Sequence, residues 1–228
     1  MTPTPALDPS LTVPADTWFA VDWATFMQLA ALPDYAPGKF YYHQQQARIE
    51  MPPVGYNHSS DHSLLGHAVH LYAGLNRIPL NGHDNLSYRQ PGHREAQPDL
   101  SFYIGESVVA IPYGTTIVNL DELPPPTLVV EVANTSLADD LGQKRLLYEQ
   151  LGVQEYWVVE VQQLQVFAFA IAAGGSRQID TSQVLPGLSM AFVVALLQRA
   201  RTTPHSEVTR WLCETLPAST APAEEPGS

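Results

Sequence analysis

The sequence predicts a single α/β domain in which helices flank a mixed central sheet. Apolar residues make up 45% of the 228 residues and the mean hydropathy is −0.09, which supplies enough apolar surface for a buried core. Helical and strand-like periodicities alternate along the chain, as is typical of α/β proteins. We expect the domain to span residues 15–216, because residues 1–14 and 217–228 are rich in Pro, Ser, Thr and Ala, as solvated tails are.

The first half of the chain predicts two helices and a set of strands. Asp22 is a suitable N-cap for a helix that runs to Leu32. Residues 40–51 alternate loosely between apolar and polar side chains and predict a strand or hairpin, which a pair of prolines ends. Residues 60–76 carry a wide apolar face and predict the second helix. Short strands are expected at residues 86–90, 99–104 and 128–133.

The second half of the chain predicts a helix with recognisable start and stop signals. Ser136 and Asp139 have the spacing of a capping box, and Gly152 follows the last turn as a C-terminal stop. Beyond it we expect two strands joined by a two-residue turn at Gln162 and Gln163, and then two closing helices. These four elements are expected at residues 155–161, 164–170, 189–201 and 206–216.

The charge balance excludes a protein that holds nucleic acid by bulk positive charge. The formal net charge is −12, and Lys39 and Lys144 are the two lysines of the chain. Contact with nucleic acid must therefore be local, with a metal ion neutralising phosphate. Cys213, the single cysteine, cannot form an internal disulfide, which favours a reducing cytoplasm. Because no apolar run reaches the ~18–20 residues that span a bilayer and the N-terminus lacks a secretory pattern, we expect a cytoplasmic protein without membrane contact.

A carboxylate inside a strand of apolar residues is the first candidate functional group. Glu131 lies in the stretch LVVEVAN, and near-continuous apolar runs of this kind belong to central strands that are buried on both faces. A carboxylate in that position is costly unless it is paired, hydrogen-bonded or metal-bound. Glu131 is therefore either a buried acid with an arginine or backbone partner, or a metal ligand or catalytic acid.

Asp99 and Lys144 are the second and third candidates. Asp99 follows a proline at the start of a predicted strand, where its side chain can point at a site, although a Pro-Asp pair is also common in turns. Lys144 lies in the helix after the strand of Glu131, and this helix folds back over the sheet toward both carboxylates; alone, Lys144 would be a surface lysine. Two carboxylates on adjacent strands beside a lysine predict a magnesium-dependent phosphodiesterase site, because Mg²⁺ prefers oxygen ligands and activates both a water and the phosphoryl group.

A resemblance to a known family is carried by three stretches, QPDLSFYIG, TLVVEVANTS and DLGQKRLLYEQLGVQEYWVVEV, and by IEMPPVGYNH before the second helix. Together they resemble the Uma-type restriction endonucleases of the PD-(D/E)XK nuclease superfamily, over about residues 22–198. The resemblance implies an αβββαβ restriction-endonuclease-like core and hydrolysis of DNA. It also implies Mg²⁺, for which Mn²⁺ would substitute, bound by Asp99, Glu131 and the backbone carbonyl of Val132.

The chain departs from the superfamily pattern at one position. The usual lysine stands two residues after the second acid, where this chain has Ala133, and Lys144 on the following helix would take its role. His58 occupies a position where the family often has a histidine near the site. Gln143 is a further candidate because it adjoins Lys144, although a place on the helix surface is the favoured interpretation.

Other functions remain open at this point. The acidic charge and the missing lysine favour a catalytically silent nuclease fold that serves as a binding or scaffold module. His58 and His62 stand one helical turn apart and would let a zinc hydrolase bind its metal, but the glutamate of an HExxH motif is absent. We interpret these two, together with His67 and His70, as exposed or capping residues. A nuclease that cuts both strands commonly needs two sites, so a homodimer is expected.

Overall fold

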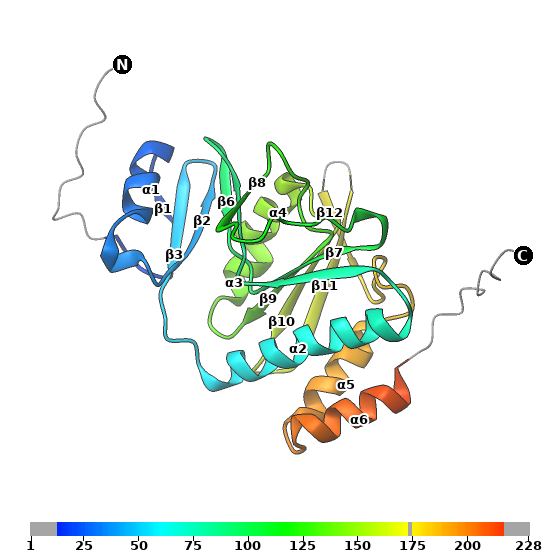
Figure 1. Ribbon diagram of the computed structural model, residues 1–228. Coiled ribbons are helices and arrows are strands. Elements are labelled where there is room, and N and C mark those ends of the chain that lie inside the picture. Colours follow the sequence, from blue (N-terminus) through cyan, green and yellow to red (C-terminus); the bar gives the residue numbers. More distant parts are fainter. Residues whose placement is uncertain (1–12, 173–174, 217–228) are drawn as a thin grey trace, which may run out of the picture.

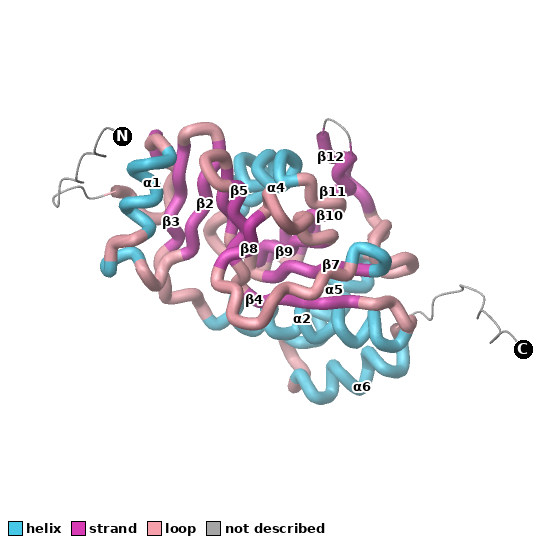
Figure 2. The backbone as a smooth tube through the Cα atoms, turned by 45° about the horizontal axis from the view of Figure 1, so that its top comes forward, coloured by secondary structure: helices cyan, strands magenta, loops and turns pink. Residues whose placement is uncertain are grey.

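The computed structural model describes residues 13–172 and 175–216, so the predicted tails lie outside the described residues except for positions 13 and 14. The described strands form two six-stranded mixed sheets. The first sheet has the order β1 (Phe19–Ala20), β3 (Gln46–Glu50), β2 (Lys39–His43), β6 (Arg94–Ala96), β5 (Ser87–Gln90) and β8 (Ile117–Asn119). The second has the order β12 (Gly175–Ile179), β11 (Gln165–Ala172), β10 (Glu155–Glu160), β9 (Leu128–Ala133), β7 (Leu100–Ile104) and β4 (Leu80–Asp84). Their strands run in different directions (Figure 2).

The helices cover both faces of the second sheet. On one face lie α2 (Tyr56–Leu75), α5 (Met190–Ala200) and α6 (His205–Thr215), which share a core with β7, β9 and β10 (Figure 1). On the other lie α3 (Leu137–Asp139), a π-helical turn (Asp140–Lys144) and α4 (Arg145–Leu151), which pack between the two sheets. The first sheet carries α1 (Trp23–Ala30), and short 3-10 turns follow at Pro33–Tyr35 and Gly105–Ser107. Among the described helices, none is long and apolar enough to cross a membrane.

The predicted fold class is confirmed. The elements α2, β4, β7, β9, α4 and β10 occur in the αβββαβ order, with β5 and β6 inserted between β4 and β7 and with β8 inserted between β7 and β9. β7 is antiparallel to both β4 and β9, and β10 returns parallel to β9 after the crossover through α4, because parallel neighbours need a long connection. The alternation along β9 is also as predicted, since Leu128 and Val130 face one core while Val129 and Ala133 face the other.

The prediction of one central sheet needs a correction, because the described strands form two sheets and the hairpin predicted at residues 40–51 lies in the first of them. The segment predicted at residues 86–90 forms β5 and belongs to the first sheet, whereas the first strand of the αβββαβ core is β4. β4 reads LNGHD, a stretch without the β-branched or aromatic residues that mark strands. Its place at the edge of the sheet, paired with β7 alone, explains why so polar a segment is tolerated there.

The predicted helix ends and turns are confirmed in part. Asp22 does cap α1, since its side chain accepts a hydrogen bond from the backbone N–H of Thr25 at 2.8 Å, and Gly152 does end α4 in the left-handed conformation, with φ 83°. The predicted capping box is wrong. The hydroxyl of Ser136 donates a hydrogen bond to the Asp140 carboxylate at 2.6 Å and makes no capping hydrogen bond to the helix backbone. The second helix begins at Tyr56, earlier than predicted. The turn between β10 and β11 is longer than two residues.

Candidate functional site

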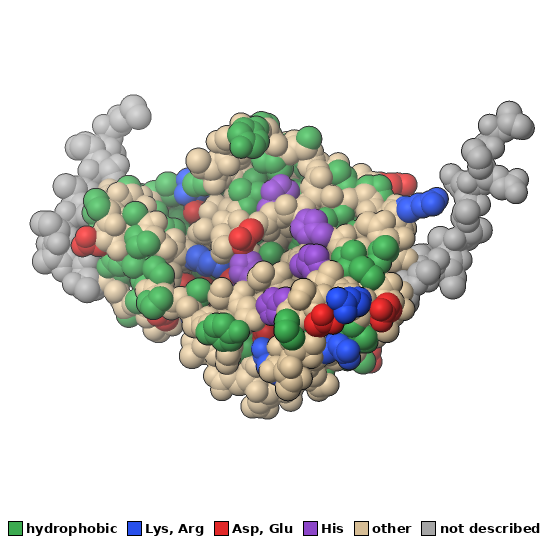
Figure 3. Space-filling model, turned by 60° about the horizontal axis from the view of Figure 1, so that its bottom comes forward, with side chains coloured by type: hydrophobic (Ala, Val, Ile, Leu, Met, Phe, Trp, Pro, Cys, Tyr) green, Lys and Arg blue, Asp and Glu red, His purple; other side chains and the backbone are tan. Residues whose placement is uncertain are grey.

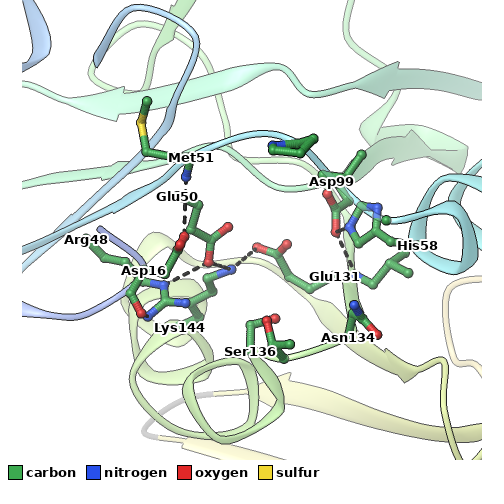
Figure 4. A pocket seen from close by; sticks show the side chains of 15 residues that line it. Asp16, Arg48, Glu50, Met51, His58, Asp99, Glu131, Asn134, Ser136 and Lys144 are labelled. Carbon is green, nitrogen blue, oxygen red and sulfur yellow. Dashed lines mark hydrogen bonds and ion pairs between the residues drawn. The ribbon is translucent and has the colours of Figure 1, made fainter. Parts of the chain in front are cut away.

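Polar side chains from both sheets and from two helical segments converge on one pocket of about 170 Å³ (Figure 4). The pocket collects residues from β3, the start of α2, the start of β7, β9 and the π-helical turn. Among them are Glu50, His58, Asp99, Glu131, Val132 and Lys144. The three residues predicted from the sequence to act together therefore do share one cavity.

Gln143 is not part of this pocket. It precedes Lys144 in the π-helical turn, but its side-chain amide donates a hydrogen bond to the side chain of Gln46 in β3. Consecutive helical residues point in directions about 100° apart, so the neighbour of a site residue turns away from the site. The structure supports Gln143 as a residue that ties the helix to the first sheet.

Asp99 ends the loop before β7 and is almost fully buried. Its Oδ2 accepts a hydrogen bond from the backbone N–H of Val132 at 2.7 Å and lies 3.2 Å from Nε2 of His58. Its Oδ1 pairs with the ammonium group of Lys39. Burial by itself would raise the pKa of Asp99, but the hydrogen bond from His58 and the charge of Lys39 outweigh it and hold the pKa below its ordinary value. Asp99 is therefore an ionised carboxylate that already attracts positive charge.

Glu131 lies in the middle of β9 with 2% of its surface exposed. The hydroxyl of Tyr148 donates a hydrogen bond to its Oε1 at 2.6 Å, and the hydroxyl of Tyr41 donates a second one at 3.3 Å. Both hydrogen bonds end on Oε1, which leaves Oε2 to coordinate a cation in the pocket. Burial, reinforced by the negative charge of Asp99, raises the pKa of Glu131 to about 8, although Lys144 counteracts part of the rise.

Lys144 supplies the positive charge of this buried cluster. Its Nζ lies 2.8 Å from Oε1 of Glu50, 2.9 Å from Oδ1 of Asp140 and 3.7 Å from Oε1 of Glu131. It also lies 4.2 Å from the centre of the Tyr41 ring. Burial alone would lower the pKa of Lys144, but the surrounding carboxylates raise it well above its ordinary value. The lysine is thus a permanent cation, and it contacts one of the two predicted carboxylates rather than both.

Sequence reasoning missed several of the charged groups. Glu50 lies at the end of β3 and also pairs with Arg48 at 2.8 Å. Asp140, whose place at the start of a helix would explain it without function, is a buried partner of Lys144. Lys39, which was not singled out as a site residue, forms an ion pair with Asp99. Two features of the sequence could have identified these groups. Glu50 directly precedes the Met-Pro-Pro segment of the family resemblance, and Lys39 is one of the two lysines of the chain.

The histidines divide into two groups. His67 and His70 are exposed, as predicted. The interpretation as exposed or capping residues is wrong for His58 and His62, whose side chains are 12% and 14% exposed and pair with Asp99 and with Asp84.

The oxygen donors of the pocket fit a hard divalent cation. Asp99, Glu131 and Val132 line the same cavity. Asp99 and Glu131 lie next to each other where β7 pairs with β9, since Leu100 lies opposite Val130, Asp99 directly precedes Leu100 and Glu131 directly follows Val130. Mg²⁺ prefers a few carboxylate ligands and retains several waters, and a pocket that opens to solvent leaves room for them.

Comparisons with known proteins agree with this fold. A family model, Uma2, described as "Putative restriction endonuclease", matches residues 23–213. A crystal structure described as "a putative nuclease belonging to DUF820" from Anabaena variabilis is similar, with a TM-score of 0.57 and 17% sequence identity over 75% of this chain and 98% of that chain. No curated protein matches the chain. At this identity the structural likeness shows the fold, whereas the family match covers most of the sequence and confirms the resemblance. This chain belongs to the Uma2 family of restriction-endonuclease-like proteins.

Proposed function

We propose that this protein is a metal-dependent nuclease that hydrolyses phosphodiester bonds in DNA. The observation that carries the proposal is the meeting of two buried carboxylates, Asp99 and Glu131, with the buried ammonium group of Lys144 at one pocket. Membership of the Uma2 family supports a nuclease. The proposed ligands of the cation, Mg²⁺ or Mn²⁺ in its place, are the two carboxylates and the backbone carbonyl of Val132.

The residues of the pocket fit distinct parts of this reaction. A bound Mg²⁺ would polarise the phosphoryl oxygen and lower the pKa of a water ligand. Tyr148 and Tyr41 hold one oxygen of Glu131 and so orient the other. Lys144 is fixed in position by its carboxylate partners and places a positive charge where negative charge develops on the phosphate. Lys39 neutralises Asp99 when no cation is bound.

The proposed homodimer would bring two such pockets to the two strands of a duplex. β4 and β12 are the edge strands of the second sheet, and the proposed homodimer would form at one of these two edges. The homodimer and the cytoplasmic location stay predictions.

The direct test compares cleavage of plasmid DNA and of RNA by the full chain with Mg²⁺ or Mn²⁺. Asp99→Asn is expected to lower DNA cleavage by about 10²–10³-fold, the range typical for loss of one electrostatic group in an active site. Asp34→Asn is the matched control, because Asp34 is exposed and does not line the pocket. Equal cleavage by wild type and Asp99→Asn would contradict the proposal. Calorimetric metal binding that depends on Asp99, without cleavage of any nucleic acid, would favour the silent binding module.

The pH dependence of cation binding provides a second test. A cation must displace the proton from Glu131, whose pKa is raised to about 8, so the apparent affinity is expected to rise with pH and level off above about 8. Calorimetry in buffers of different ionisation enthalpy should detect about one proton released per ion at pH 6.5 and almost none at pH 9. Absence of proton release at pH 6.5 would show that Glu131 is not a ligand.

A further inference from the structure

We propose that His58, His62 and Asp99 form a second cation site, specific for a transition metal ion that prefers imidazole ligands, such as Zn²⁺. This site lies beside the carboxylate pair and shares Asp99 with it. The proposal does not require the chain to cleave DNA.

The geometry of α2 brings the two imidazoles together. His58 and His62 are one turn apart and therefore lie on the same face of the helix. Their ring centres are 5.9 Å apart with the planes at 89°, and one ligand atom from each lies within 4.8 Å of the other and of an Asp99 oxygen. Ligands bound at about 2.0–2.1 Å lie roughly 3.3–4.2 Å apart, so small side-chain adjustments close the site.

The cluster is built into the fold rather than spread over the surface. Histidine side chains gather on the face of the molecule that carries α2 (Figure 3), but these two are mostly buried, and Figure 4 shows His58 directed at Asp99. Among the described residues, the buried Nδ1 of His58 has no hydrogen-bond partner. Burial and the contacts with Asp99 and Asp84 position the two rings, as is expected of preorganised metal ligands.

Charge and ligand type select the ion. His62 pairs through Nε2 with Oδ1 of Asp84 at 2.9 Å, and a carboxylate in this position either orients a ligating histidine or completes the ligand set. Lys39 pairs with Oδ1 of Asp99, whereas His58 lies against Oδ2. With neutral imidazoles, the charges of Asp99, Asp84 and Lys39 leave a net negative charge around the two rings. Imidazole suits Zn²⁺, Co²⁺ and Ni²⁺, whereas Mg²⁺ prefers oxygen, so the two neighbouring sites differ in the ion they take.

The test uses Co²⁺ as a spectroscopic probe and Zn²⁺ in calorimetry, with the full chain. Wild type is expected to bind one ion that gives the visible absorption of an imidazole-ligated Co²⁺. His62→Gln should weaken this binding by at least about 10-fold, and His58→Gln should do the same, so a folding defect in one variant does not decide the result. His67→Gln is the matched control on the same helix, because His67 contacts Thr209 of α6 instead.

Glu131→Gln separates the two sites, because Glu131 belongs to the carboxylate pair and not to the histidine cluster. This variant is expected to retain the Co²⁺ absorption. Co²⁺ binding that both histidine variants leave unchanged, or that Glu131→Gln abolishes, would overturn the inference. The measurement is independent of cleavage: histidine-dependent Co²⁺ binding by a chain that cuts no DNA would sustain this inference and defeat the proposed nuclease, and cleavage with Mg²⁺ without such binding would do the reverse.

Discussion

Replacement of Lys144 by methionine is expected to lower the free energy of unfolding by about 3–5 kcal/mol. The reason is that the lysine is the cation for the half-buried carboxylate of Glu50 and the buried carboxylate of Asp140, and removal of one partner of such an ion pair leaves uncompensated charge. Urea unfolding at pH 7.5 measures the change. The loss should shrink as the pH falls, because protons then neutralise the carboxylates in place of the ammonium group.

Lys39→Met is the matched control for this prediction. Lys39 is partly exposed, and its partner Asp99 keeps the hydrogen bonds from Val132 and His58 when the lysine is removed. We expect it to cost about 1 kcal/mol or less, as for partly exposed pairs. A Lys144→Met variant no less stable than Lys39→Met would contradict the assignment of Lys144 as the central cation of the cluster.

Glu131→Gln is expected to lower metal-dependent cleavage by about 10²–10³-fold while it raises stability at pH 8 by about 1 kcal/mol or more. The pKa of Glu131 is raised from 4.5 to about 8 in the folded protein, chiefly by burial. A raised pKa contributes stability that is complete below about pH 4.5 and is lost as the pH rises through about 8. Glutamine resembles the protonated carboxyl and escapes this loss, so the advantage of the variant should disappear at acid pH.

The control for this prediction is the same change at Glu106, which is exposed in the 3-10 turn after β7. Glu106→Gln should leave both cleavage and the free energy of unfolding unchanged. Unfolding at pH 8 and pH 5 and cleavage of plasmid DNA give the two readouts. A Glu131→Gln variant that cleaves as wild type does, or that is less stable than wild type at pH 8, would contradict the role given to this carboxylate.

The candidate site was predictable where a charged residue stood out from the sequence around it. Glu131 is conspicuous because its strand is otherwise apolar, and Lys144 because lysines are so scarce. Glu50 and Lys39 were not identified because they come from the first sheet, and their approach to the second sheet depends on how the sheets pack. The spacing of residues in the sequence does not predict that packing. The Met-Pro-Pro segment of the family resemblance, which directly follows Glu50, did point to this part of the chain.

The helices and strands were predictable where the spacing of apolar residues reflects which side of the element is buried. The hairpin of β2 and β3, the strand β9 and both C-terminal helices were expected from their patterns. β4 was not, because an edge strand can be polar. The π-helical turn was not either, since its widened hydrogen-bond pattern leaves no mark on apolar spacing. Such turns are frequent at functional sites, and this one contributes Asp140 and Lys144 to the buried cluster.

The most direct measurement of the central claim is the anomalous scattering of Mn²⁺ in crystals of the full chain grown with that ion. We predict an Mn²⁺ peak about 2.1 Å from a carboxylate oxygen of both Asp99 and Glu131, with the carbonyl oxygen of Val132 as a further ligand and the ammonium group of Lys39 displaced from Asp99. Mn²⁺ bound at the histidines alone, or at no position that involves Glu131, would contradict the claim that these two acids hold the cation.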